Sequence, residues 1–187
     1  MSPMAKGANI TLRQKTPNLN GVVLGVAWDS GGERSLGDNL ALLTILVGAD
    51  GRALSPEHVV FFNQLVSSDL STAQLEQTLG DDDEQVEIEL DAVFDEVVRV
   101  VTVLYLSEGS GSIRSLSQLR SLVVRLLNLD DGASITSTVD LTQGLDNETA
   151  LKLAELYRHN DEWKFRTLGL GYSAGLAGVA KEFGVPL

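Results

Sequence analysis

Short β-prone runs separated by turn residues recur along the whole chain, and they limit the fold more than any other feature of the sequence. Many short strands with turns every eight to twelve residues are typical of two packed antiparallel sheets. The 187 residues show no composition break and no internal repeat, so we expect a single domain over residues 1–187. The predicted fold class is mainly β, a two-sheet antiparallel β-sandwich with a short C-terminal helix. Strands are predicted over residues 8–13, 21–28, 40–47, 59–62, 86–90, 97–106, 122–129, 134–141, 150–157 and 163–168.

Two of these runs also predict how the strand is buried. Gly21 to Trp28 is nearly all apolar, as a strand covered on both faces would be. Val86 to Leu90 alternates between apolar and acidic residues, which indicates a half-exposed strand. The segments 130–132 and 158–162 are predicted to connect the last four strands in pairs as hairpins.

Helix is predicted in only a few places. Leu176 to Phe183 has apolar residues at helical spacing and is followed by Gly184 as a stop signal. Residues 67–77 suit a short helical or irregular segment, and 112–121 suit a second short helix. The serine- and glycine-rich tract 107–112 is predicted to be a surface loop.

The composition excludes several classes of function. The chain has no cysteine and two histidines, so thiolate chemistry and a multi-histidine zinc site are excluded or nearly so. A formal net charge of −12, from 26 acidic and 14 basic residues, argues against nucleic acid and against anionic membrane surfaces. The sequence has no signal-peptide core and no apolar run of membrane-spanning length. We therefore expect a cytoplasmic location.

Most of the negative charge is concentrated in one stretch. Residues 80–96 carry nine acidic and no basic side chains, and the remainder of the chain has a net charge of only −3. Clustered carboxylates at Asp81, Asp82, Asp83 and Glu84 repel one another, and a hard cation such as calcium would relieve that repulsion. The alternative is a solvated turn that improves solubility and protects a sheet edge. The spacing does not match an EF-hand loop.

Other motifs have structural explanations. Residues 109–112 resemble a nucleophile elbow only loosely, and residues 169–175 lack the βαβ unit that a dinucleotide fingerprint requires. His58 is expected at the surface near a strand entrance, and His159 in a hairpin turn. In the last hairpin, alternation places Trp163 and Phe165 on one face and Lys164 and Arg166 on the other. That hairpin is either part of the core or a binding face.

The same C-terminal residues closely resemble the closing signature of the TerD family of tellurium-resistance and stress proteins. The resemblance is carried by residues 155–166 (ELYRHNDEWKFR), 169–172 (GLGY) and 175–176 (GL). It extends over nearly the whole chain through residues 6–9 (KGAN), 22–29 (VVLGVAWD), 61–63 (FFN) and 80–84 (GDDDE).

This resemblance implies a two-sheet β-sandwich that binds calcium through acidic loops and has no established enzymatic activity. It also implies protein partners, resistance to tellurite and other chemical stress, and indirect membrane association through a complex. The metal ligands that it suggests in this chain are Asp29, Asp81, Asp82, Asp83 and Glu84.

The sequence departs from the family pattern where further ligands would be expected. Two aspartates usual in the family fall on Asn39 and Ala41, and the aspartate after its long strand is replaced in the run Leu104 to Leu106. Since fewer anionic ligands bind calcium more weakly, we expect one weak site, built from Asp29, Asp81, Asp83 and Glu84, or none.

Two functions remain open from the sequence. The first is a non-enzymatic stress-response protein that binds calcium weakly or has lost it, and that acts by contact with other proteins. The second is a small-molecule-binding protein or a hydrolase that uses paired carboxylates such as Asp81 and Asp83. A pocket combining these acids with an aromatic wall would favour the second.

Overall fold

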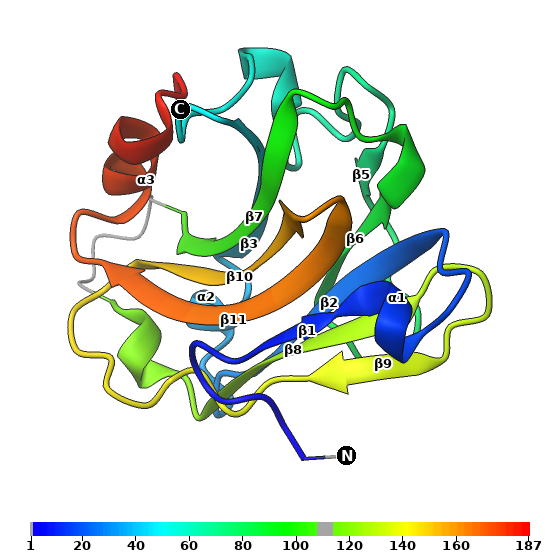
Figure 1. Cartoon of the computed structure of the whole chain (residues 1–187). Coiled ribbons are helices and arrows are strands. Elements are labelled where there is room, and N and C mark those ends of the chain that lie inside the picture. The colour runs from blue at the N-terminus through cyan, green and yellow to red at the C-terminus, as the bar shows by residue number, and fades with distance from the viewer. Residues whose placement is uncertain (1, 108–113) are drawn as a thin grey trace.

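The computed structural model, which describes residues 2–107 and 114–187, contains two antiparallel sheets packed face to face (Figure 1). The six-stranded sheet has the order β1 (Asn9–Thr11), β11 (Glu162–Tyr172), β10 (Ala150–His159), β7 (Val97–Leu106), β3 (Leu40–Gly48) and β4 (Val59–Val60). The five-stranded sheet has the order β5 (Thr72–Gln74), β6 (Glu84–Glu89), β2 (Gly21–Asp29), β8 (Ser121–Asn128) and β9 (Ser134–Ser137). The predicted β-sandwich is therefore confirmed.

The helices are short and lie at the margins of the sandwich. They are α1 (Leu12–Lys15), α2 (Arg34–Gly37) and α3 (Gly175–Phe183), with single 3₁₀ turns η1 (Pro56–His58), η2 (Leu90–Ala92) and η3 (Leu116–Gln118). Of these, α3 matches the predicted C-terminal helix, and it ends at Gly184 in the left-handed conformation that glycine favours. No helix in the described part of the chain is long and apolar enough to cross a membrane.

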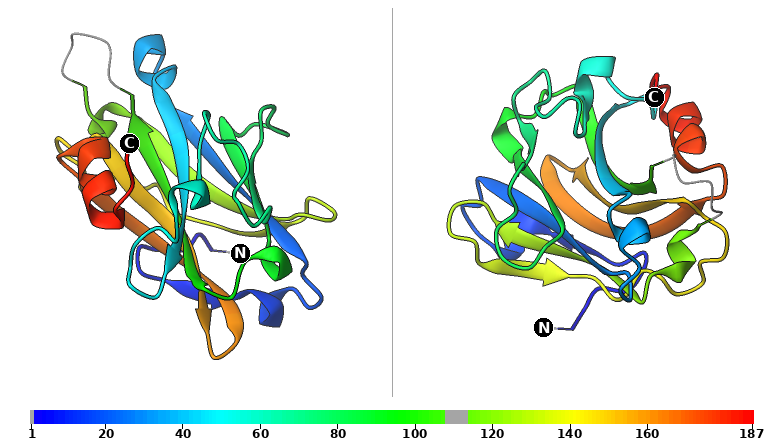
Figure 2. Two further views of the ribbon diagram at one scale, coloured as in Figure 1. Left: turned by 90° about the horizontal axis from the view of Figure 1, so that it is seen from above. Right: turned by 180° about the vertical axis from the view of Figure 1, so that it is seen from behind.

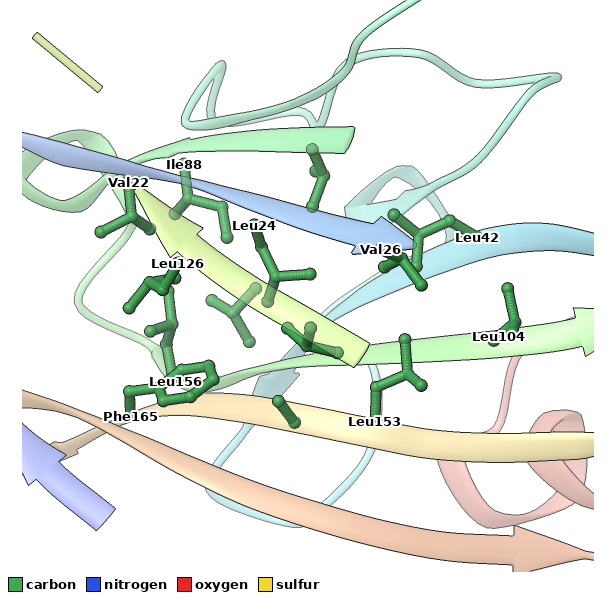
Figure 3. Packing of buried hydrophobic residues seen from close by; sticks show 14 of the residues in the cluster. Val22, Leu24, Val26, Leu42, Ile88, Leu104, Leu126, Leu153, Leu156 and Phe165 are labelled. Atoms are coloured by element: carbon green, nitrogen blue, oxygen red, sulfur yellow. The ribbon is translucent and has the colours of Figure 1, made fainter. Parts of the chain in front are cut away.

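The main core lies between the two sheets, where alternate residues of each strand point inward (Figure 3). Leu24 of β2 and Ile88 of β6 face Leu42, Leu104 and their neighbours across the interface, and all four are at most 1% exposed. A second apolar cluster forms where α3 covers the outer face of the six-stranded sheet (Figure 2). There Val179 and Phe183 pack over residues of β3 and β7.

Both predicted hairpins are present, and the last is tight. His159 pairs with Glu162, so that only Asn160 and Asp161 form the turn. Both residues have positive φ, 51° and 62° respectively, as in a two-residue turn whose twist matches that of the strands. This geometry places Trp163 and Phe165 on one face, as the alternation predicted, and that face lies in the core, where they are 4% and 0% exposed.

The differences from the predicted elements are local. The first run becomes helical at Leu12, and the strands predicted over 59–62 and 134–141 end early, at Val60 and Ser137. The segment 67–77 contains the edge strand β5, which its polar sequence did not indicate, although the rest of it is irregular. In the 112–121 segment, of which residues 114–121 are described, η3 forms, and β8 begins at Ser121. The loop predicted over 107–112 lies almost entirely outside the described residues.

Candidate metal-binding pocket

The acidic loop between β5 and β6 folds back onto the outer face of the five-stranded sheet and is held there by the strand that follows it. The side-chain amide of Gln85 brackets the loop, because its Oε1 accepts from Leu79 N and its Nε2 donates to Leu79 O, both at 2.9 Å. Asp83 N donates to Val26 O at 2.8 Å, so the loop also attaches to β2. The acidic residues therefore occupy fixed positions.

Asp82 turns away from the others and lies on the outer face of the sheet, over Gly25. Its side chain is fully buried, where Arg125 Nε donates to Oδ1 at 2.8 Å and Gln85 Nε2 donates to Oδ2 at 2.8 Å. A β-carbon at position 25 would overlap the Asp82 carboxylate, which explains the glycine in the middle of a valine-rich strand. Asp82 thus anchors the loop, and its charge is balanced by Arg125.

Asp83 and Glu84 instead face an open pocket of about 520 Å³ at the end of the sandwich. The pocket is bounded by the end of β2, the start of β3 and α2. Asp29, one of the predicted ligands, also lines it, whereas Asp81 is exposed outside it. Asp38 and Arg34 also line it, although no sequence motif indicates them as site residues. The lining residues are Trp28, Asp29, Ser30, Arg34, Gly37, Asp38, Leu40, Asp83 and Glu84.

The carboxylates in the pocket are only partly hydrogen-bonded. Asp83 Oδ2 accepts from Trp28 N at 2.8 Å, and Glu84 Oε2 accepts from Gln74 Nε2 at 3.0 Å. Asp29 Oδ1 accepts from Gly31 N at 2.8 Å. Among the described residues each of these three groups has a second oxygen with no hydrogen-bond partner. Those oxygens remain able to bind a ligand.

Burial and mutual repulsion disfavour the ionised form of two of these groups. Burial raises the pKa of Asp83, and the charge of Asp82 adds to the increase, while the hydrogen bond from Trp28 N opposes it. Burial likewise raises the pKa of Glu84, where the Gln74 hydrogen bond opposes the change and the Asp83 charge reinforces it. A bound cation would stabilise both ionised forms.

Comparison with known proteins assigns the whole chain. A family model described as the TerD domain matches residues 1–183. The chain belongs to the TerD family. It is 35% identical over 186 residues to the tellurium resistance protein TerD of Serratia marcescens, covering 97% of this chain and 96% of that protein. It is 32% identical over 187 residues to general stress protein 16U of Bacillus subtilis (strain 168), covering 97% and 96% respectively.

A solved structure shares the TerD fold. The crystal structure of a homologue of telluride resistance protein (TerD) from Streptomyces coelicolor A3(2) superposes with a TM-score of 0.67. It is 20% identical in sequence and covers 90% of this chain and 100% of that one. The sandwich described above is therefore the TerD fold.

The acidic pocket offers carboxylate oxygens of the kind that calcium prefers, but it does not form a complete coordination shell. In residues 2–107 and 114–187, no three acidic or histidine side chains are grouped closely enough to hold a metal ion as they stand. Asn39 donates its side-chain amide to Ser35 O, and Ala41 has no oxygen in its side chain. Calcium accepts water ligands, so Asp29, Asp83 and Glu84 could bind it only with several waters or after a loop movement.

The TerD C-terminal signature builds a charged cluster on the outer face of the six-stranded sheet. Glu155 is 4% exposed and pairs with Arg99 Nη1 at 3.3 Å and Arg166 Nη1 at 3.4 Å. The Arg166 guanidinium lies 4.5 Å from the centre of the Tyr157 ring. On the opposite face of the same hairpin, Arg158 stacks on the core residue Trp163 at 4.4 Å and donates to Val97 O. These contacts explain why the signature contains charged residues as well as apolar ones.

The surface position predicted for His58 is wrong. This side chain is 4% exposed, because η1 folds it under the loop that leads to β5. Its Nδ1 lies 2.7 Å from Ser55 Oγ, and its ring centre is 5.8 Å from that of Phe94. His159 is exposed at the last hairpin, as expected. Neither histidine lines the acidic pocket.

Proposed function

We propose that this TerD protein is a non-enzymatic, cytoplasmic stress-response protein that binds calcium weakly in the acidic pocket and acts through contact with other proteins. Two observations support the metal site: Asp83 and Glu84 each have an unpaired oxygen in the pocket, and both have raised pKa values. The family relatives include proteins named for tellurium resistance and for general stress.

The proposed site differs from the one expected from sequence in its ligand set. Asp29, Asp83 and Glu84 would contact the ion, and water would supply the remaining ligands. Asp82 would act indirectly, because its ion pair with Arg125 holds the loop that presents Asp83. Asp38, which also lines the pocket, is a further candidate ligand. Arg34, the one basic group among the described lining residues, would weaken the affinity for a cation by repulsion.

Calorimetric titration of calcium into chelator-stripped protein tests this proposal. We expect a weak binding isotherm that the double substitution Asp83→Asn/Glu84→Gln abolishes. Asp81→Asn is the matched control, because it removes one charge from the same loop without changing the pocket lining. Absence of heat and of any change in melting temperature at millimolar calcium would contradict the metal site.

A second candidate, a small-molecule-binding site or hydrolase, is favoured by one observation. Trp28 forms an aromatic wall beside the carboxylates, and the volume of about 520 Å³ is within the range of ligand pockets. Neither histidine nor lysine lines the pocket, so proton transfer would fall to Asp83 and Glu84. Titration with small organic cations, followed by Trp28 fluorescence against a Trp28→Phe control, distinguishes this candidate from calcium binding.

A further inference from the structure

The net charge of the molecule comes from one continuous part of the chain. Residues 53–98 contain 12 acidic residues and no lysine or arginine, whereas the other residues contain 14 acidic and 14 basic side chains. The formal charge of −12 therefore belongs wholly to residues 53–98. These residues run from η1 through β5 and β6 to the start of β7, at the upper right of Figure 1.

The same part of the chain exposes most of the large apolar side chains found at the surface. Seven such side chains are exposed among the described residues, and five of them lie between positions 53 and 98: Phe62, Val66, Leu70, Leu79 and Phe94. Leu70 is the most exposed, at 74%, and Phe94 is 46% exposed. Exposed apolar residues gathered in one region mark interaction sites more often than residues scattered singly.

The backbone segments that carry Leu70 and Phe94 are held together by one carboxylate. Asp69 Oδ2 accepts from Phe94 N at 3.1 Å, and Asp69 immediately precedes Leu70. Three acidic residues lie beside these segments: Glu57, whose carbonyl accepts from Ser68 N, and Asp95 and Glu96, which follow Phe94. We call Leu70 and Phe94 with these three acids the Leu70–Phe94 patch.

The patch keeps Leu70 in a backbone conformation that costs free energy. The φ angle of Leu70 is 63°, in the left-handed region that leucine rarely adopts. Three hydrogen bonds to Asp69 Oδ1, from the hydroxyls of Ser67 and Ser71 and from Ser71 N, hold this turn in place. Folding alone gains nothing from exposing a leucine in a strained conformation, so a role in recognition is the natural explanation.

We propose that the Leu70–Phe94 patch docks a positively charged, amphipathic segment of a partner protein. The apolar pair would fill the centre of the interface, and Glu57, Asp95 and Glu96 would face lysine or arginine at its rim. A second copy of this chain is a poor occupant, because its corresponding part is equally negative and the remainder is balanced. An anionic membrane surface would be repelled by the same charge.

This inference rests on the proposed role in protein contact and specifies the chemistry of the partner. It is independent of the metal site, since none of the patch residues lines the acidic pocket. Failure of the calcium titration would leave it standing, and its own failure would leave the calcium result unchanged.

The test uses a labelled synthetic peptide of about 15 leucine and lysine residues at helical spacing, with fluorescence anisotropy as the readout. A scrambled peptide of the same composition controls for general attraction to a negative protein. At an ionic strength of about 0.15 M, we expect the amphipathic peptide to bind more tightly than the scrambled one. Leu70→Asn should weaken its binding by about tenfold.

The matched control is Leu170→Asn, which removes another exposed leucine, 52% exposed on β11, outside residues 53–98. Asparagine tolerates the left-handed conformation, so Leu70→Asn should retain or raise the melting temperature while losing affinity. Phe94→Ser provides a second variant and should also weaken binding. Equal binding of the two peptides, equal affinity of the Leu70→Asn and Leu170→Asn variants, or no binding to the wild-type protein would overturn the proposal.

Discussion

Two groups of carboxylates in this molecule, the buried Asp69 and the more exposed pair Asp83 and Glu84, are stabilised by hydrogen bonds to very different degrees. Asp69 is 8% exposed and accepts four hydrogen bonds, from Ser67 Oγ, Ser71 Oγ, Ser71 N and Phe94 N. Asp83 and Glu84 accept one each. Burial alone would raise the pKa of Asp69, yet these donors lower it, whereas the pKa values of Asp83 and Glu84 are raised.

The number of hydrogen-bond donors separates the two groups: four donors lower the pKa of Asp69 although burial raises it, and one donor each leaves the pKa values of Asp83 and Glu84 raised. Asp69 requires no cation, because hydrogen bonds from the protein already stabilise its negative charge. Asp83 and Glu84 have only one donor each and repel each other, so a cation could still stabilise them. Asp82, paired with Arg125, belongs with Asp69 as a structural group although it lies next to Asp83 in sequence.

The largest effect is expected from Asp69→Ala. The substitution leaves the N–H groups of Ser71 and Phe94 without their acceptor in a buried site, and it should lower the free energy of unfolding by about 3 kcal/mol. Urea denaturation measures the change. Asp95→Ala, which removes an exposed acid from the same part of the surface, is the control and should cost much less. A variant as stable as wild type would mean that the Asp69 hydrogen bonds are not structural.

Gly25→Ala should be the next most damaging substitution, at about 2 kcal/mol. The new β-carbon would overlap the Asp82 carboxylate and push the acidic loop away from β2. Thermal or urea unfolding measures the cost. In the double variant Gly25→Ala/Asp82→Ala the overlap is gone, so the two effects should be clearly less than additive. Simple additivity would show that the loop does not depend on this contact.

Substitution of the pocket carboxylates should stabilise the protein, in contrast to the two substitutions above. In chelator at neutral pH, Asp83→Asn/Glu84→Gln should raise the free energy of unfolding by about 0.5 kcal/mol, because it removes a repulsive pair. The asparagine amide still offers an oxygen to Trp28 N, so that hydrogen bond need not be lost. Differential scanning calorimetry is sensitive enough for the comparison. A lower free energy of unfolding in the double variant would mean that the fold requires Asp83 and Glu84, as it requires Asp69.

Much of the fold was predictable because a β-sandwich is encoded locally. Alternation in residues 86–90 and the tight turn at Asn160 and Asp161 act within a few residues, and both were visible in the sequence. The strand β5 was missed because its polar side chains, Thr72 and Gln74, are buried through contacts that form only in the folded sheet. His58 was misplaced for a similar reason, since η1 and the following loop cover it.

The candidate site was predictable only in part. The acidic stretch identified the loop, but the direction of each side chain depends on partners distant in sequence. Arg125, 43 residues away, turns Asp82 outward, and β2 brings Trp28 and Asp29 beside Asp83. Gly25 was the one available signal, because a glycine within a buried strand indicates that another group approaches closely. Arg34 and Asp38 carried no motif of their own.

The smallest expected effect is in the pH dependence of stability, where the two groups should separate most clearly. Because the native pKa values of Asp83 and Glu84 are raised, their contribution to stability is fully present below the unfolded-state value of about 4 and is lost as the pH rises through the native values. The stability gained by Asp83→Asn/Glu84→Gln should therefore be near zero at acidic pH and increase towards neutrality.

The native pKa of Asp69 is lowered, so its contribution to stability is present above about pH 4 and is lost as the pH falls through the native value. The deficit of Asp69→Asn should accordingly stay constant from about pH 5 to 7 and shrink only below about pH 4. Urea midpoints measured across this pH range for both variants and wild type test this difference. If the midpoints of both variants change with pH in the same way, the two sites do not differ as their hydrogen bonds indicate.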